Sequence, residues 1–282
     1  MIAVVYSGSR YATWELADRG KLVSEFRTVG INPYFDNEQL IISLMNKTNE
    51  LITHAERIKR IYFFGAGASS KERRQVIANA LKTFFRNAKV SIQHDLKAAA
   101  LATCGDTTGI VGIIGSGSNA AYYDGKKIEK NNYGLGFVLS DEGSSNWLGR
   151  KLLKNFLTQT MPMDFREKFH QKYGLDRKQI LEKVYRNPQP VLFLSSFSGF
   201  LRDNKDNKYV RQIVTEGFNS FLNKCIVPLS EKHPGEKIHF AGTVAFTFEN
   251  LLKDTAQKHG LQVSTVLKAP INNVLNYYIN KN

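Results

Sequence analysis

The sequence has few of the residues that mark secreted, metal-binding or membrane-spanning proteins. Its 282 residues include only two cysteines, Cys104 and Cys225, which lie far apart without metal-ligand spacing, so no disulfide framework is expected. The six histidines also lack ligand spacing, so no metal site is expected. No run of about 18 apolar residues occurs, which argues against a membrane-spanning helix. Residues 1–6 lack the basic and long apolar segments of a secretion signal, and this indicates a cytoplasmic protein with reduced thiols.

The sequence also lacks a motif for nucleic-acid binding, although it is strongly basic. It contains 39 Lys and Arg against 25 Asp and Glu, a formal net charge of +14. The basic residues form short, scattered groups, for example at residues 71–74 and 205–211. No helix-turn-helix, zinc-finger or aromatic RNA-binding pattern accompanies them. We therefore expect no nucleic-acid partner and interpret the charge as a solvated surface that favours anionic metabolites.

What the sequence does contain is an apolar run that breaks into small residues. Residues 110–114 read as a buried strand, and a second short run ends before a turn at Asp124 and Gly125. Between the two runs lie Gly115, Ser116, Gly117, Ser118 and Asn119. Such a loop can turn its backbone N–H groups toward a phosphate without an intervening side chain. The pattern predicts strand, phosphate-sized loop, strand, turn and strand, and an ordinary hairpin is the alternative.

The same order occurs near the N-terminus. Residues 2–5 read as a strand, followed by a loop with Ser7, Gly8 and Ser9, a strand at residues 12–16, a turn ending in Gly20 and a strand at residues 22–27. This is a weak internal repeat, with copies that begin near residues 1 and 109. It predicts two similar lobes, each with a strand and a phosphate-sized loop, that hold a nucleotide in a cleft between them.

The rest of the chain alternates strands and helices. A helix is predicted over residues 37–60, helical hairpins over 161–234 and a last helix after Pro270. Further buried strands are predicted at residues 61–64, 90–93, 134–139, 237–240 and 262–266. This alternation predicts an α/β protein with mixed sheets.

Three acidic residues lie where strands give way to helices. Asp95 follows the strand at residues 90–93, where an aspartate is an ordinary N-cap but can also act as a general base. Asp141 and Glu142 lie before Gly143 and a helix start predicted at Ser144 or Ser145. They can cap that helix or bind sugar hydroxyls.

Two asparagines and a Gly-Thr pair are weaker candidates. Asn32 and Asn119 are expected in loops, where asparagine is a common turn residue. Gly242 and Thr243 lie between a strand and a helix, and could let a base or ribose approach the backbone.

Taken in order, these signals resemble the N-acetylglucosamine kinase-like proteins of the BadF/BadG/BcrA/BcrD ATPase family, within the actin/hexokinase/Hsp70 superfamily. The resemblance covers essentially the full length. It is most specific at residues 115–119 and 139–144, where the family has a Gly-Asp-Glu-Gly-Ser signature, and residues 30–34 and 93–100 also match. It implies two ribonuclease-H-like (actin-like ATPase) lobes around a central cleft. These are an N-terminal lobe of residues 1–107 plus 268–282 and a C-terminal lobe of residues 108–267 with a helical insertion.

The resemblance also implies an ATP-dependent kinase that phosphorylates the 6-hydroxyl of N-acetylglucosamine or a related amino sugar. Asp95 would be the base, and Asn32, Asn119, Asp141 and Glu142 would form the sugar site. The ATP phosphates would lie between two loops, formed by Ser7, Gly8, Ser9 and Arg10 and by Gly115, Ser116, Gly117 and Ser118. Gly242 and Thr243 would lie near the adenosine. A homodimer is common in the family.

The first loop departs from the family pattern. The family usually has an Asp, sometimes a Glu, at the position of Tyr6, and it helps to hold the Mg²⁺ of Mg–ATP, usually through water. A phenol is a poor ligand for a hard cation at neutral pH. The Thr and Lys that would touch phosphate are replaced by Arg10 and Tyr11. Arg10 can supply the lost positive charge but not a metal-holding carboxylate.

Two hypotheses follow from this departure. In the first, the protein is a working sugar kinase in which Asp141 or Glu142 takes over part of the metal-holding role. In the second, it is a catalytically impaired pseudokinase that binds an amino sugar or a nucleotide as a sensor. A nucleic-acid-binding protein rests on charge alone and ranks last.

Overall fold

The chain divides into two compact units, each with its own sheet and core. The structure is a computed structural model that describes residues 1–281. Unit 1 consists of Met1–Thr107, Tyr123–Ile128 and the described part of Ala269–Asn282, and unit 2 of Thr108–Tyr122 and Glu129–Lys268. Both units combine strands and helices, so the predicted α/β class is confirmed. No helix within residues 1–281 is long and apolar enough to cross a membrane.

Unit 1 is built on a five-stranded sheet in the order β3-β2-β1-β4-β5. The strand β1 pairs antiparallel with β2 and parallel with β4, β2 pairs antiparallel with β3, and β4 pairs parallel with β5. The strands are β1 (Ile2–Ser7), β2 (Tyr11–Asp18), β3 (Lys21–Val29), β4 (Arg60–Gly65) and β5 (Lys89–His94). The five strands predicted in residues 1–94 are therefore present.

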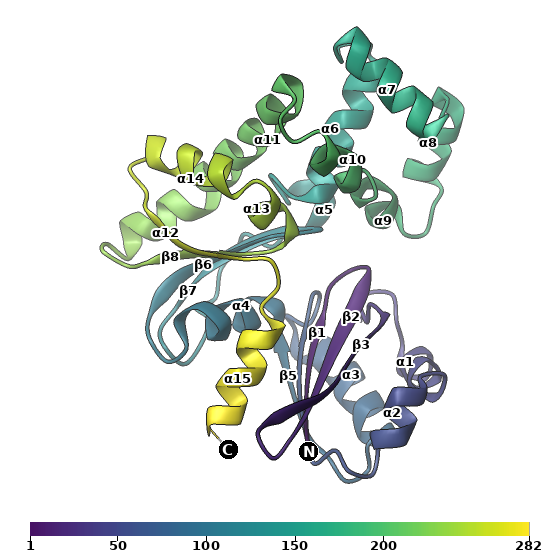
Figure 1. Ribbon diagram of the computed structural model, residues 1–282, viewed down its shortest axis with the longest axis vertical. Coiled ribbons are helices and arrows are strands. Elements are labelled where there is room, and N and C mark those ends of the chain that lie inside the picture. Colours follow the sequence, from purple (N-terminus) through teal and green to yellow (C-terminus); the bar gives the residue numbers. More distant parts are fainter. Residues whose placement is uncertain (282) are drawn as a thin grey trace. The chain divides into compact units, whose positions relative to one another are not determined.

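Helices cover both faces of this sheet (Figure 1). The face that carries Trp14 and Phe63 packs against α1, α2 and α3. The face that carries Val4 and Phe64 packs against α4 and α15. The helices are α1 (Glu38–Asn46), α2 (Asn49–His54), α3 (Lys71–Phe84), α4 (Asp95–Cys104) and α15 (Ile271–Lys281). Successive residues of a strand point to opposite faces, which is why the apolar residues of β2 and β4 supply both cores.

The single helix predicted over residues 37–60 is wrong, because two shorter helices occupy this segment. The helix α1 ends at Asn46 and α2 begins at Asn49. Thr48, between them, has an extended backbone with φ −110° and ψ 102°. Its hydroxyl donates a hydrogen bond to the carbonyl oxygen of Leu44 at 2.9 Å. Short polar side chains that bond to nearby backbone compete with helix continuation, and the polar residues 46–49 interrupt the apolar period.

One carboxylate in this sheet is buried without a partner. Glu15 of β2 is 1% exposed, and neither of its carboxylate oxygens has a hydrogen-bond partner in residues 1–281. Burial, and then the negative charge of Glu25 opposite it on β3, raise the pKa of Glu15 to about 7. An unpaired carboxylate in such a place is neutral at low pH and costly to ionise.

Glu15→Gln is therefore expected to stabilise the protein at alkaline pH and not at acidic pH. The unfolded carboxyl ionises near pH 4.5, whereas the folded one ionises near 7, so the wild type loses stability as the pH rises through this window. The difference amounts to about 3 kcal/mol above pH 8, at about 1.4 kcal/mol per pKa unit. Urea unfolding at pH 4.5 and pH 8 measures it. Equal stability of the two proteins at pH 8 would contradict the raised pKa.

Unit 2 is built on a four-stranded sheet in the order β7-β6-β8-β9. The strands are β6 (Gly109–Ile114), β7 (Ser118–Tyr123), β8 (Ile238–Ala241) and β9 (Val263–Leu267). The strand β8 lies parallel to both β6 and β9. Every residue of β6 and β8 is buried, as expected of parallel strands covered on both faces.

The helices of unit 2 and these strands share one large core. They include the helical hairpins predicted over residues 161–234, and one segment among them, η1 (Leu222–Ile226), is a π-helix. The remaining members are α5 (Gly136–Leu139), α6 (Ser145–Leu157), α7 (Met163–Tyr173), α8 (Arg177–Tyr185), α9 (Pro190–Ser195), α10 (Ser198–Asp203), α11 (Lys208–Phe221), α12 (Val227–Lys232), α13 (Thr243–Thr247) and α14 (Glu249–Lys258).

The buried strand predicted over residues 134–139 is wrong. This segment forms the short helix α5, and Leu135, Val138 and Leu139 are more than half exposed. Gly136 has a φ of +80°, a conformation outside the strand region that glycine adopts readily. The apolar segment therefore forms a glycine-containing turn and a short helix whose apolar side chains are exposed.

The third strand predicted after the turn at Asp124 and Gly125 is also absent. Beyond the turn, only one isolated bridge joins Tyr123 to Ile128. The Asp124 carboxylate accepts hydrogen bonds from the backbone N–H groups of Lys126 and Lys127. These hydrogen bonds hold the chain in a tight turn. Hydrogen bonds from a side chain to nearby backbone compete with strand pairing.

Candidate functional site

The loop that follows β1 is held in place by hydrogen bonds and close packing with residues 30–31. Ser7 is fully buried; its Oγ donates to the carbonyl oxygen of Ile31 at 3.0 Å and accepts from the Ile31 N–H at 2.8 Å. Gly30 donates its N–H to the Arg10 carbonyl oxygen at 3.1 Å. A Cβ at position 30 would overlap the carbonyl oxygen of Gly8. The backbone of Gly8, Ser9 and Arg10 therefore packs directly on glycine, and the Arg10 side chain is exposed.

Asn32 follows this segment, and its side chain is positioned by local contacts. Its backbone N–H donates to Asp36 Oδ2 at 2.7 Å, and its Oδ1 accepts from the Tyr34 N–H at 3.1 Å. A Cβ on Gly67, in the loop after β4, would lie 2.6 Å from Asn32 Oδ1. The Asn32 Nδ2 has no hydrogen-bond acceptor within residues 1–281, so this amide can donate to a ligand.

Asp95 is the first residue of α4, one position later than the N-cap that was predicted for it. The N-cap is His94. Asp95 Oδ1 accepts from the Leu96 N–H at 2.8 Å and lies 2.9 Å from His94 Nδ1. His94 Nδ1 is also 3.5 Å from the Leu96 N–H, but it cannot both donate and accept. The shorter contact decides, so His94 Nδ1 donates to Asp95, and the Leu96 N–H bonds the carboxylate.

The Asp95 carboxylate is held in its ionised form. Burial raises its pKa, but the charge of His94 and the hydrogen bond from its ring outweigh burial, and the pKa lies below its usual value. Burial lowers the pKa of His94, but Asp95 outweighs this and raises it. The two groups therefore form an ion pair near neutral pH. Asp95 Oδ2 has no hydrogen-bond donor in the described residues, so it can accept a proton from a hydroxyl.

Tyr6 does not offer a metal ligand. Its ring packs against the cluster formed by β1, β4, α4 and α15. Burial and then the negative charge of Asp95 raise the pKa of its phenol far above the usual value. The phenol therefore stays protonated, and Mg²⁺ prefers carboxylate and water oxygens. No group of three or more His, Cys, Asp or Glu side chains in residues 1–281 is arranged to hold a metal ion.

In unit 2, the loop after β6 is closed and tied to the start of α6. The Gly115 N–H donates to the Gly117 carbonyl oxygen at 2.9 Å, and the Ser145 N–H donates to the Gly115 carbonyl oxygen at 2.8 Å. Gly242 packs on the same strand end, since a Cβ there would overlap the carbonyl oxygen of Ile114. The structure thus brings Gly242 against the loop, and Thr243 follows it as an exposed residue.

Asp141 anchors this loop with both oxygens of its carboxylate. Its Oδ1 accepts from the Ser118 N–H at 2.9 Å, and its Oδ2 accepts from Asn146 Nδ2 at 2.7 Å. Asn146 Nδ2 also donates to the Ser116 carbonyl oxygen at 2.7 Å. Asp141 is 8% exposed, and burial raises its pKa above the usual value despite these bonds. These hydrogen bonds give Asp141 a structural role. Its predicted direct contact with the sugar stays a prediction.

The other residues of the signature have structural contacts of their own. Glu142 pairs with Lys224 of η1 at 2.5 Å and accepts from Ser140 Oγ at 3.2 Å. Gly143 has a φ of +72° and packs against Gly217 of α11. Ser144, one of the two caps predicted, accepts from the Trp147 N–H as the N-cap of α6. Both carboxylates therefore have structural partners, and the metal-holding role predicted for Asp141 or Glu142 stays a prediction.

Asp141→Ala is expected to lower the free energy of unfolding by about 2–3 kcal/mol, because it removes two buried hydrogen bonds to a carboxylate. Asp141 has a φ of +66°, which asparagine tolerates better than alanine. Asp141→Asn is the matched control: it keeps this conformation and one acceptor, so we expect less than half of the loss. Urea unfolding measures both values. Equal losses would mean that the carboxylate does not anchor the loop.

Two further polar groups of unit 2 are relevant to ligand binding. Ser118 is 6% exposed, and its Oγ has no hydrogen-bond partner in residues 1–281. Such an orphaned donor beside the loop backbone suits a phosphate oxygen. Asn119 was expected in a loop, but it lies in β7. Its Oδ1 accepts from the Ala120 N–H at 2.8 Å, and its Nδ2 would be 2.6 Å from a Cβ on Gly134.

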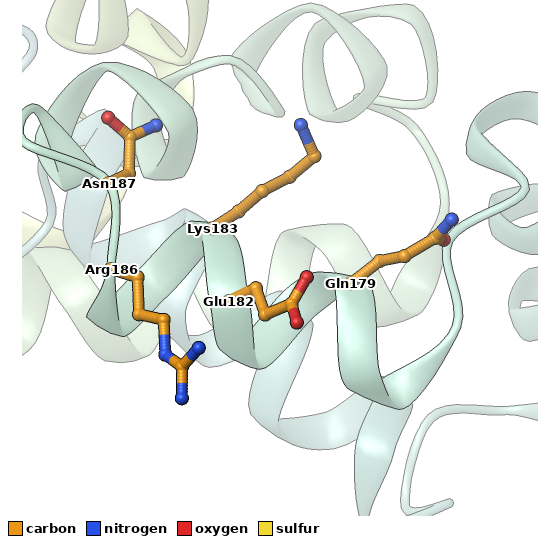
Figure 2. A pocket seen from close by; sticks show the side chains of 5 residues that line it. All are labelled: Gln179, Glu182, Lys183, Arg186 and Asn187. Atoms are coloured by element: carbon orange, nitrogen blue, oxygen red, sulfur yellow. The ribbon is translucent and has the colours of Figure 1, made fainter.

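A surface hollow on α8 does not coincide with any predicted site residue. Figure 2 shows that its lining side chains come from one helix and the turn after it, and that Lys183 and Arg186 point in different directions. The lining residues, all exposed, are Gln179, Glu182, Lys183, Arg186 and Asn187. Side chains that diverge from one helix do not form a binding site of convergent polar groups.

Sequence reasoning missed three residues that shape the candidate sites. His94 sets the charge state of Asp95, and its adjacency to an aspartate at a strand end was a usable signal. Gly30 is needed for close packing under the first loop, and Asn146 links Asp141 to the second. Gly30 contacts residues of the first loop, and Asn146 contacts Ser116, which is 30 positions away. No local sequence pattern therefore indicates either residue.

The chain was compared with family models, curated proteins and solved structures, and only the solved structures gave matches. The chain matches no family model, and no curated protein matches it. Among solved structures, it is similar to a protein from Porphyromonas gingivalis that has been proposed to be an N-acetylglucosamine kinase. The identity is 34%, with 99% of each chain covered and a TM-score of 0.93.

Two more distant structures show the fold alone. One is a protein from Chromobacterium violaceum, also proposed to be an N-acetylglucosamine kinase, with 12% identity over 98% of this chain and 99% of that chain and a TM-score of 0.69. The other is a ROK family glucokinase from Streptomyces griseus in complex with glucose and AMPPNP, with 12% identity over 98% and 97% and a TM-score of 0.57. The actin-like ATPase fold expected for the chain is therefore confirmed.

Proposed function

The chain belongs to the N-acetylglucosamine kinase-like proteins of the BadF/BadG/BcrA/BcrD ATPase family, and from this membership we propose that it is an ATP-dependent amino-sugar kinase. The substrate in this proposal is N-acetylglucosamine or a close relative, phosphorylated at the 6-hydroxyl. The catalytic lobes in this proposal are residues 1–107 plus 268–282 and residues 108–267; the two compact units differ from them in that Tyr123–Ile128 belongs to unit 1 and Lys268 to unit 2. The reaction takes place in the cytoplasm, where ATP is available.

The observation that carries the proposal is the Asp95 carboxylate, ionised by His94 and with Oδ2 open to a donor. In the reaction, the sugar hydroxyl oxygen forms a bond to the γ-phosphorus of ATP, and its proton passes to Asp95 Oδ2. The bond between the γ-phosphorus and the bridging oxygen breaks, and ADP leaves with that electron pair. Catalysis of phosphoryl transfer depends on such positioning and on charge neutralisation.

The remaining candidate residues bind the two substrates. Asn32 and Asn119 donate hydrogen bonds to the sugar through their Nδ2 groups. Asp141 and Glu142 support the sugar and phosphate side by holding the loop and the segment around η1. The phosphates are bound by backbone N–H groups and side chains of two loops: Ser7, Gly8, Ser9 and Arg10, and Gly115, Ser116, Gly117 and Ser118. Gly242 and Thr243 lie near the adenosine.

Magnesium enters this proposal only as part of the Mg–ATP substrate. The residue at position 6 does not fit a protein-held Mg²⁺, because its phenol is protonated and because no group of three or more His, Cys, Asp or Glu side chains within residues 1–281 is arranged to hold a metal ion. The positive charge of Arg10 can neutralise part of the phosphate charge. The reaction steps above use only residues of the chain and the two substrates.

The same observation at Tyr6 favours a second candidate function. A protein with an intact sugar side and no metal-holding carboxylate can bind an amino sugar or a nucleotide as a sensor without rapid turnover. In this case ligand binding involves Asn32, Asn119 and the two loops, as in the kinase.

An ADP-release assay separates the two candidates. The purified chain is incubated with ATP, Mg²⁺ and either N-acetylglucosamine, N-acetylmuramic acid or glucose, and the product is identified by mass spectrometry. A kinase gives sugar-dependent ADP and a 6-phosphate above the level of Asp95→Asn. The sensor gives no turnover above that level but a sugar-dependent change in a calorimetric titration. Absence of both turnover and binding would contradict both functions.

A further inference from the structure

Two arginines at the start of α3 have no acidic partner in the described chain. The guanidinium groups of Arg73 and Arg74 donate only to carbonyl oxygens and a hydroxyl within residues 1–281, and neither forms an ion pair there. The adjacent carboxylate of Glu72 accepts a hydrogen bond from Ser70 instead. Cations are also unfavourable in the first turn of a helix, where the macrodipole is positive. The stability of α3 therefore does not account for these two residues.

The guanidinium group of Arg73 is held in one orientation by three contacts. Its Nε donates to the Gly67 carbonyl oxygen at 2.6 Å, and its Nη2 donates to Ser69 Oγ at 2.5 Å. Its Cζ lies 4.2 Å from the centroid of the Tyr34 ring, a cation–π contact. The two hydrogen bonds use two of the five N–H donors of a guanidinium group, and the other donors have no acceptor within residues 1–281. The group is thus oriented, with free donors, before any ligand binds.

Arg74 holds the same loop from the next position along the helix. Its Nη1 donates to the carbonyl oxygens of Ala68 and Ser69, at 3.3 and 2.8 Å. Both guanidinium groups therefore lie beside one short loop, residues 67–69, which follows β4. Two cations that share a loop without a carboxylate repel each other, and an anion bound between them would remove this repulsion.

The loop that holds Arg73 is also in contact with Asn32. A Cβ on Gly67 would lie 2.6 Å from Asn32 Oδ1 and 3.0 Å from the ring of Tyr34. The carbonyl oxygen of Gly67 is the group that accepts from Arg73. In the proposed function, Asn32 donates a hydrogen bond to the sugar. A substituent on that sugar can therefore reach Arg73 past the backbone of a single glycine.

The charges of both arginines extend to the proposed catalytic pair. Burial lowers the pKa of His94, Asp95 raises it above its usual value, and the charges of Arg73 and Arg74 oppose the effect of Asp95. The Asp95 carboxylate is already paired with His94 at 2.9 Å, so it does not neutralise the arginines. An anion brought by the ligand would neutralise them.

We propose that Arg73 and Arg74 form a subsite for a carboxylate carried by the sugar, so that the preferred substrate is an acidic amino sugar and not a neutral one. This inference rests on the proposed function, because it extends the same site at Asn32 and Asp95. Guanidinium groups bind carboxylates through two parallel hydrogen bonds. The 6-hydroxyl is directed to Asp95, so the carboxylate lies elsewhere on the sugar, either on the acyl group at the nitrogen or in an ether at a ring hydroxyl.

The test compares the binding of each acidic sugar with that of its own amide, which has the same size and no charge. The acids are N-succinylglucosamine, with the carboxylate on the acyl group, and N-acetylmuramic acid, with the carboxylate in an ether at O3. In calorimetric titration, one of the two acids should bind roughly 10- to 100-fold more tightly than its amide, the range for one hydrogen bond to a charged group. The acid that does so locates the carboxylate. Raising KCl from about 50 to about 500 mM should reduce this ratio.

Arg73→Gln should bring the ratio of the two dissociation constants close to one, and Arg74→Gln should lower it by a few-fold. Arg73→Lys keeps the charge without the planar fork, so it should give an intermediate ratio. The matched control is Arg86→Gln, which removes the same charge from an exposed residue just beyond the other end of α3. It should leave the ratio unchanged, and circular dichroism confirms that each variant is folded.

Two results would overturn the subsite and leave the proposed function standing. One is that N-acetylglucosamine binds while neither acid binds more tightly than its amide. The other is a preference for an acid that neither Arg73→Gln nor high salt reduces. If no sugar binds, acidic or neutral, the proposed function is wrong and the subsite is wrong with it.

Discussion

Asp95→Asn should lower kcat for sugar phosphorylation by about 1,000-fold, within the range that general-base catalysis contributes. The amide keeps the size of the side chain, and its oxygen can still accept from the Leu96 N–H that now bonds the carboxylate. It cannot accept the hydroxyl proton. The dissociation constant for the sugar should therefore change only a few-fold, because binding does not require proton transfer. Steady-state ADP release and calorimetric titration with N-acetylglucosamine measure the two quantities.

His94→Gln is the informative companion to this variant. The charge of His94 and its hydrogen bond hold the pKa of Asp95 below the usual value, so wild-type kcat should be lost only when the pH falls through that low value. In His94→Gln the cation is absent while burial still raises the pKa, so the acid limb of the kcat profile should move to higher pH. A kcat in Asp95→Asn within tenfold of the wild type would exclude Asp95 as the base. An unmoved acid limb in His94→Gln would exclude the ion pair.

The framework of each unit was predictable because local composition determines it. Residues 61–64 and 110–114 are apolar runs that stop at glycine, and residues 2–5 are an apolar run followed by Tyr6 and then Ser7. Such runs become buried parallel strands whose carboxyl ends carry loops. A helix cap at Ser144 or Ser145 was predictable, since serine before a helix satisfies free N–H groups. The observed N-cap bond confirms it.

The errors arose where glycine or a side-chain bond outweighs apolar composition. Residues 134–139 are apolar enough for a strand, but the positive φ of Gly136 turns the chain into a short helix. The segment after Asp124 contains Ile128, but the Asp124 carboxylate bonds two backbone N–H groups and holds a turn. In both places a single residue determines the backbone conformation, and the hydrophobic pattern of the segment does not indicate that conformation.

The roles of the signature carboxylates depend on contacts between distant residues. The position of Asp141 beside Glu142 is visible in the sequence, and it suggested a sugar site. Its oxygens bond Ser118, which is 23 positions away, and Asn146, so it anchors the loop. Glu142 pairs with Lys224, which is 82 positions away. Such pairings depend on the tertiary arrangement of β6, α6 and η1, and so sequence reasoning identified the residues but not these contacts.

Tyr6→Asp should raise kcat by about 10- to 100-fold in the presence of Mg²⁺, if the missing carboxylate limits the rate. Burial, and then the negative charge of Asp95, raise the pKa of the Tyr6 phenol, so position 6 is within electrostatic range of Asp95. A carboxylate at position 6 would repel Asp95 until a divalent cation neutralised it. The increase should therefore depend on the Mg²⁺ concentration and should be small when Mg²⁺ barely exceeds ATP. Initial rates of ADP release across a Mg²⁺ series measure it.

Two neutral replacements separate the carboxylate from the loss of the ring. Tyr6→Asn has the size of the aspartate without its charge, and Tyr6→Phe removes only the hydroxyl. Neither should raise kcat, and Tyr6→Asn should share the loss of stability that follows from removing a ring packed against the α4 and α15 cluster. Rates are compared at a temperature where all three variants are folded. An increase in Tyr6→Asn equal to that in Tyr6→Asp would show that space, and not charge, limits the wild type. No increase in any variant would mean that the phenol is compatible with the full rate, and that the chain positions Mg–ATP without a carboxylate at the end of β1.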